Sequence, residues 1–204
     1  ASLYRKSSIN LLLIGGLFFV LVNTNVSELF KIMPEGYAGG ELVVLFISCA
    51  KLFNMSLGNN RAIINNSKHY RITLFNGVGM ALMLVYLNKY FYYDLNYGTE
   101  GLAFATFLSI VVFGLFKTWF VKYKLNMFPF TLKTMLQLLV IVGFYLLFNY
   151  WNFNIPEITI SKFDISPIIN IILKSIIITI LYMFVVIKLN VSDQISGLVK
   201  RFIK

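Results

Sequence analysis

Residues 167–189 read PIINIILKSIIITILYMFVVIKL, in which Lys174 and Lys188 are the only charged residues. A helix needs about 20 apolar residues to cross the hydrocarbon core of a bilayer, and this run is long enough. A spanning segment is a helix or part of a closed barrel, because lipid offers no hydrogen-bond partner to its backbone. Pro167 suits the first turn of a helix. The stretch therefore predicts a transmembrane helix.

Five further apolar stretches precede this one. They cover residues 9–22, 40–57, 70–87, 101–121 and 132–150. The first is short, and two alternatives remain for the apolar residues Val26, Leu29, Phe30 and Met33, which either extend this span or lie along the interface. The composition agrees with them, since 58% of the 204 residues are hydrophobic, 13% are charged and the mean hydropathy is +0.77. Soluble domains contain about 25% charged residues. We expect an all-α fold, a polytopic transmembrane helix bundle with six spans.

The segments that connect the spans alternate in charge. Lys and Arg concentrate on the cytoplasmic side of membrane proteins, so the basic segments predict cytoplasmic N and C termini. The basic side holds Arg5, Lys6, Arg61, Lys68, Arg71, Lys117, Lys122, Lys124, Lys133, Lys188, Lys200, Arg201 and Lys204. The other side holds Lys31, Lys89 and Lys162 with Glu28, Glu35, Glu41, Asp94, Glu100, Glu157 and Asp164.

The chain divides into a six-helix lobe, residues 1–190, and a tail, residues 191–204. In the tail, apolar residues recur at helical spacing while the basic residues lie off that face. This pattern is typical of an amphipathic helix on anionic lipid, and Ser192 can cap its start. A frayed polar end is the alternative.

Sequence features that would indicate an enzyme are scarce. The single histidine, His69, has no second His or Cys nearby, so we expect no metal site. We expect the single cysteine, Cys49, to be a small buried hydrophobic residue. Gly77 and Gly79 lack the third glycine of a phosphate-binding loop and favour helix packing. The net charge of +10 follows from the positive cytoplasmic loops, so we expect no nucleic acid partner. We predict no enzymatic activity and no cofactor.

Two lysines lie at depth in the expected spans. Lys51 falls in the middle of the second span, and Lys174 lies about 10 Å into the sixth. A lysine in lipid costs about 2.5–3.5 kcal/mol, so both are expected to face a partner or a wet cavity that accepts an anion. Snorkelling to the interface is the alternative. Further candidates for the cavity are Ser48, Asn54 and Asn170.

Three segments carry a resemblance to a known family. Residues 43–76 are VVLFISCAKLFNMSLGNNRAIINNSKHYRITLFN. They resemble a membrane span, a short cytoplasmic loop and the re-entry of the chain into the membrane. Residues 98–109, GTEGLAFATFLS, follow a G-x-x-G-x-A-x-A-T pattern, and residues 127–132, MFPFTL, read as the loop before the next span. Their order and spacing resemble the polysaccharide flippases of the multidrug/oligosaccharidyl-lipid/polysaccharide exporter superfamily. The similarity covers most of residues 1–135.

The second motif also has a physical interpretation. Its small residues let a neighbouring helix approach closely, so we expect it to serve helix packing. The glycines suit a turn into the membrane. The motif residues are Gly98, Gly101, Ala103, Ala105 and Thr106.

The resemblance implies a function and a place in the cell. Such flippases have two lobes of six helices and move undecaprenyl-pyrophosphate-linked oligosaccharide across the bacterial inner membrane by alternating access, for O-antigen, capsule or exopolysaccharide synthesis. This chain resembles the C-terminal lobe, so its expected partners are the missing N-terminal lobe, the lipid-linked oligosaccharide and membrane lipids. A polysaccharide polymerase and glycosyltransferases of the pathway are further partners.

Three other functions remain as alternatives. A drug or cation antiporter of the same superfamily would need membrane-embedded carboxylates, and Glu41, at an outer end, is the nearest candidate. An integral membrane transferase would need clustered carboxylates or histidines at an interface. A scaffold subunit would need only a partner-binding face.

Overall fold

The computed structural model describes residues 2–34, 39–151, 153, 159–160 and 163–192. Within these residues the chain is almost entirely helical. The elements are α1 (Ser2–Ile32), α2 (Glu41–Ser56), α3 (Asn60–Asn65), α4 (Arg71–Lys89), the π-helix η2 (Tyr90–Asp94), α5 (Gly98–Leu125), α6 (Leu132–Asn149), β1 (Thr159–Ile160), β2 (Phe163–Asp164) and α7 (Ser166–Lys188). The two short strands pair antiparallel just before α7.

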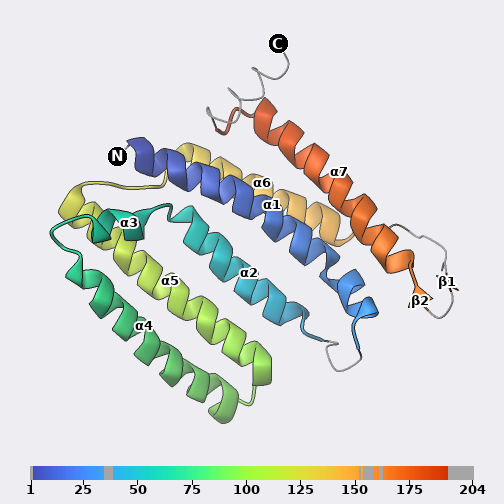
Figure 1. Cartoon of the computed structure of the whole chain (residues 1–204), viewed down its shortest axis with the longest axis horizontal. Helices are drawn as coiled ribbons and strands as arrows, with labels where there is room; N and C mark the ends of the chain where they lie inside the picture. Colours follow the sequence, from blue (N-terminus) through green and yellow to red (C-terminus); the bar gives the residue numbers. More distant parts are fainter. Residues whose placement is uncertain (1, 35–38, 152, 154–158, 161–162, 193–204) are drawn as a thin grey trace.

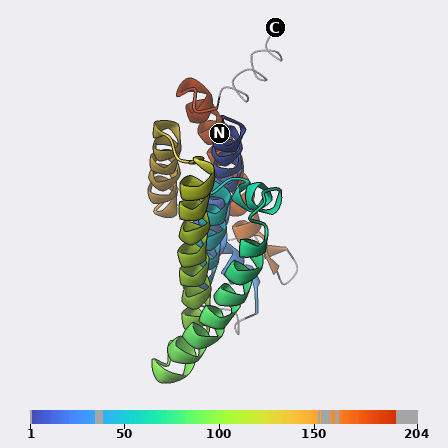
Figure 2. The same cartoon turned by 90° about the vertical axis from the view of Figure 1, so that its left-hand side faces the viewer.

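The long helices lie side by side in a thin layer (Figure 1). Helix α1 is central and packs against α2, α6 and α7, while α5 packs against α2 on one side and α4 on the other. Figure 2 shows the layer edge-on, with α6 set off from the row formed by the other long helices. Because the layer is thin, most helices have a face that no other described helix covers.

Five helices are long and apolar enough to cross a membrane, namely α1, α4 with η2, α5, α6 and α7. These confirm the helical, membrane-type fold that the sequence predicts. Helix α2, which corresponds to the expected second span, has only 16 residues. At 1.5 Å per residue it is about 24 Å long, less than the roughly 30 Å of a hydrocarbon core.

Helix α1 runs over 31 residues, so the apolar residues that follow residue 22 extend the first helix, which is one of the two alternatives that the sequence leaves open. The polar residues just after residue 22 have side chains bonded to carbonyls one turn earlier. Asn23 donates to Phe19, and Thr24 donates to Val20. These bonds satisfy polar groups inside the helix, so the helix continues through them.

Local capping explains where several helices begin and end. Thr131 and Thr134 form a reciprocal capping box at the start of α6. The Asp164 carboxylate accepts hydrogen bonds from the backbone N–H and the hydroxyl of Ser166 as α7 begins. Helix α5 ends at Asn126, which adopts the left-handed conformation that closes many helices.

The main core lies where α1 meets α6 and α7. Leu12 and Val20 of α1 and Ile178 of α7 are fully buried there. A second cluster, with Tyr4 and Ile64, joins the start of α1 to α3 and the end of α5. Helix α4 contributes little to either, since only 6% of its apolar window is buried.

The two edges of the layer differ in charge. The start of α1, the turns around α3, the α5–α6 connection and the end of α7 lie along one edge (Figure 1). Among the described residues, the charged groups along this basic edge are Arg5, Lys6, Arg61, Lys68, Arg71, Lys117, Lys122, Lys124, Lys133 and Lys188. Those along the opposite, acidic edge are Glu28, Lys31, Glu41, Lys89, Asp94, Glu100 and Asp164.

Most of the tail expected to form an amphipathic helix, residues 193–204, lies outside the described residues. Ser192 is described, and its hydroxyl donates to the Asn10 side chain at 2.7 Å. This bond ties the chain after α7 to the first half of α1.

Candidate functional site

Lys174 is buried between α7 and α1, with 3% of its surface exposed. Its Nζ donates a 2.7 Å hydrogen bond to the backbone oxygen of Thr24. The Glu28 carboxylate, one turn further along α1, also interacts electrostatically with this ammonium group. Lys174 therefore has partners inside the protein, as expected of a cation at depth.

The polar residues of α1 also bond to the helices on either side of it. Asn23 Nδ2 donates to the Ser48 hydroxyl of α2 at 2.8 Å. Asn25 Nδ2 donates to the Ser175 hydroxyl of α7 at 3.3 Å. The three consecutive polar residues 23–25 thus link α2, α1 and α7.

Glu28 was expected in a connecting segment but lies within α1, with 5% of its surface exposed. It forms an ion pair with Lys31 at 2.7 Å, and Lys31 reaches out from the layer. The Asn-Thr-Asn run at 23–25, followed by Glu28 at helical spacing, is the sequence signal that could have revealed this polar face.

A second buried polar contact joins three helices. The Tyr182 hydroxyl of α7 donates to the Leu13 backbone oxygen of α1 at 3.0 Å. It accepts from Gln137 Nε2 of α6 at 2.5 Å. Gly16 makes room for this contact, since a Cβ there would lie 2.7 Å from the Tyr182 hydroxyl.

Lys51 has a different environment, because it is exposed on α2. Among the described residues it has no hydrogen-bond or ion-pair partner. It borders an apolar groove of about 220 Å³ between α1 and α2. The groove is lined by Gly15, Phe18, Phe19, Val22, Ser48, Lys51, Leu52 and Met55.

The groove brings together only some of the residues expected to form a cavity. Ser48 and Lys51 both line it, whereas Asn54 is exposed on α2 and is not among its lining residues. Lys174 and Asn170 lie on α7, and the Asn170 Oδ1 is buried without a hydrogen-bond partner. The described grooves do not combine the two lysines.

The motif at the start of α5 lies where it can serve packing. Gly98 has a positive φ of 56°, which suits the turn into the helix. Gly101, Ala103 and Ala105 are buried, and a Cβ on Gly101 would lie 3.0 Å from the Phe91 Cβ of η2. The Thr106 hydroxyl bonds to its own helix. The close neighbour of Gly101 is thus the π-helix that precedes α5.

Comparisons with models of protein families, with curated proteins and with solved structures find no match to this chain. The functional interpretation therefore depends on the residues themselves. Within the described ranges, no three His, Cys, Asp or Glu side chains gather as a metal site would require.

Proposed function

We propose that the chain is one lobe of a flippase that moves lipid-linked oligosaccharide across the bacterial inner membrane. The observation that carries the proposal is Lys51, an exposed cation on α2 that borders an apolar groove between α1 and α2. The motif resemblance in residues 43–76 and 98–109 supports it.

Lys51 and its groove fit the two parts of such a substrate. Lys51 lies about 15 Å from the start of α2, and its charge has no partner among the described residues. A pyrophosphate group would neutralise it in a medium of low dielectric constant, where the attraction is strong. The apolar side chains of Phe18, Val22 and Met55 offer a surface to the polyprenyl chain.

The charge distribution supports a membrane orientation for this lobe. With the basic edge in the cytoplasm, both termini of residues 1–190 lie inside. Helix α2 then serves as the sixth crossing. Helix α2 lies between α1 and α5 in the layer. These two longer helices therefore set how far the protein extends along the membrane normal on either side of α2.

The exposed apolar faces of the layer support packing against lipid and against a second lobe. Leu74, Phe75 and Leu82 of α4 are each at least two-thirds exposed. Seen edge-on, the layer is thin and has two broad sides (Figure 2). In the proposed transporter, one side of the layer contacts lipid and the other contacts the N-terminal lobe.

A cation antiporter of the same superfamily is the second candidate, and Glu28 favours it. A buried carboxylate inside a helix of membrane type is what a cation-exporting site requires. Its pairing with Lys31 and its interaction with Lys174 occupy this charge, so the flippase proposal ranks first.

The test is binding of fluorescent undecaprenyl pyrophosphate to the chain in lipid nanodiscs. We expect Lys51→Gln to weaken binding about tenfold, because one charge-assisted contact is lost. Lys89→Gln, which removes a lysine at the acidic edge, is the matched control and should bind as the wild type does. Undecaprenol, which lacks the phosphates, should compete poorly.

Equal affinity of the Lys51→Gln variant and the wild type would refute the proposal. Binding of a cationic dye that is lost in Glu28→Gln, together with no binding of the pyrophosphate probe, would favour the antiporter instead.

A further inference from the structure

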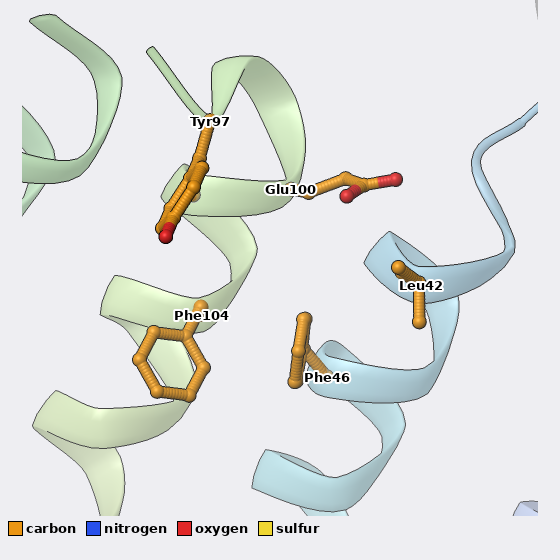
Figure 3. A pocket seen from close by; sticks show the side chains of 6 residues that line it. Leu42, Phe46, Tyr97, Glu100 and Phe104 are labelled. Carbon is orange, nitrogen blue, oxygen red and sulfur yellow. The ribbon is translucent and has the colours of Figure 1, made fainter. Parts of the chain in front are cut away.

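A pocket of about 290 Å³ opens at the acidic edge, between the first turns of α2 and α5. Figure 3 shows the Glu100 side chain extending across the gap between the two helices, with aromatic rings below it and beside it. The lining residues are Leu42, Phe46, Tyr97, Glu100, Gly101 and Phe104. None of them belongs to the groove at Lys51.

The aromatic walls are held in place by contacts behind them. Phe46 of α2 meets Phe104 of α5 edge-on, with ring centroids 5.2 Å apart. Phe91 of η2 supports the other side, since it stacks on Tyr97 at 6.2 Å and meets Phe104 edge-on at 5.2 Å. Contacts among α2, α5 and the π-helix η2 therefore hold the rings of Phe46, Phe104 and Tyr97 in place around the pocket.

Gly101 is required for this arrangement. A Cβ at this position would lie 2.9 Å from the Tyr97 Cβ and 3.0 Å from the Phe91 Cβ. Without a side chain, Gly101 lets both rings lie close to the first turn of α5. The glycine of the sequence motif thus contributes to a pocket as well as to packing.

Glu100 places a negative charge at the pocket. It is half-buried, and among the described residues it has no hydrogen-bond or ion-pair partner. The N-termini of α2 and α5 each contribute about half a positive charge nearby. Glu41 lies in the first turn of α2 and Glu100 in the first turn of α5, so each carboxylate offsets the half positive charge of its own helix end.

We propose that this pocket binds an organic ammonium group. A cation gains from the aromatic rings of Phe46, Phe104 and Tyr97 and from the Glu100 carboxylate together. An anion would be repelled by Glu100, and a neutral apolar ligand would leave that carboxylate further buried without a counter-ion. A bare metal ion needs several oxygen ligands, and among the lining residues only Glu100 supplies a carboxylate.

The size and place of the pocket narrow the ligand to a small head group. Sites for drug-sized ligands run from about 300 to 1,000 Å³, so this pocket lies at the small end. Tyrosines at the ends of membrane helices lie at the level of lipid head groups, and Tyr97 directly precedes the first residue of α5. The ammonium group belongs either to a phospholipid such as phosphatidylethanolamine or to a free organic ammonium ion such as choline. This site is independent of the flippase proposal.

The test measures binding of two probes to the full chain. In the first arm, radiolabelled choline is titrated against the chain in detergent. In the second, native mass spectrometry records whether the chain leaves nanodiscs with phosphatidylethanolamine in preference to phosphatidylglycerol. The variants are Glu100→Gln and Phe46→Leu, and Glu41→Gln is the matched control, since Glu41 carries the same charge at the same edge but does not line the pocket. Circular dichroism checks the fold of each variant.

We expect Glu100→Gln and Phe46→Leu each to weaken binding about tenfold, and Glu41→Gln to change it less than threefold. Choline binding identifies a free organic ammonium ion as sufficient, whereas retention of phosphatidylethanolamine alone identifies the lipid. The proposal is wrong if choline does not bind and phosphatidylethanolamine is retained no better than phosphatidylglycerol, or if Glu41→Gln has as large an effect as Glu100→Gln.

Discussion

Lys174 and Lys51 are the two lysines at depth in the apolar helices, and their surroundings are opposite. Lys174 is 3% exposed and bonds to the backbone of α1. Lys51 is exposed beside an apolar groove and has no partner among the described residues. Depth along a helix therefore does not distinguish a structural cation from one available to a ligand, whereas the packing of the helix does.

The largest expected effect is on stability at Lys174. Lys174→Leu removes the hydrogen bond to the Thr24 backbone oxygen and the cation near Glu28. We expect the free energy of unfolding to fall by about 1.5–3 kcal/mol, the range for a hydrogen bond to a charged group. The measurement is reversible unfolding in mixed micelles by SDS.

The matched variant is Lys51→Leu, for which we expect a change within about 0.5 kcal/mol, as for other exposed positions. If both variants lost the same stability, the distinction between the two lysines would fail.

A smaller effect is expected where helices approach closely. A Cβ on Gly16 would lie 2.3 Å from the Ile141 Cδ1 and 2.7 Å from the Tyr182 hydroxyl. Gly16→Ala should therefore destabilise the contact of α1 with α6 and α7 by about 1–3 kcal/mol. Thermal unfolding followed by circular dichroism would show this as a lower midpoint.

Gly77 of α4 provides the contrast, since a Cβ there meets nothing within 4 Å. Gly77→Ala should be neutral or stabilising by up to about 1 kcal/mol, through helix propensity alone. Similar losses in the two alanine variants would show that α4 is packed more tightly than its exposure indicates.

The smallest effect concerns Asn170, on the same helix as Lys174. Its Oδ1 is buried without a hydrogen-bond partner, so Asn170→Leu should raise the free energy of unfolding by up to about 1 kcal/mol. If the same variant lost undecaprenyl pyrophosphate binding, Asn170 would join Lys51 in the proposed binding site. Lower stability with unchanged binding would assign it a structural role.

The positions of most helices could be predicted from the sequence, because apolar runs end at charged or turn residues. Helix α7 begins one residue before the predicted Pro167 and ends at Lys188. The sequence leaves the end of the first helix open, and the bonds that the polar residues 23–25 make within α1 show why the helix continues through them. The contact of Lys174 with Thr24 joins residues 150 positions apart, which periodicity does not reveal.

The aromatic pocket could not be predicted for a related reason. Its motif glycine, Gly101, is visible in the sequence, but its neighbours depend on η2, where the helix widens into a π-turn. A pattern based on 3.6 residues per turn does not predict a π-turn, which sets the positions of Phe91 and Tyr97.

The separation of charge between the two edges of the layer also has an electrical consequence. A membrane potential changes the energy of an elementary charge by about 2.3 kcal/mol per 100 mV. The basic edge carries only positive groups among the described residues, whereas the carboxylates outnumber the lysines at the acidic edge. A voltage that is negative on the side of the basic edge therefore stabilises this orientation, and it opposes inversion of the whole layer.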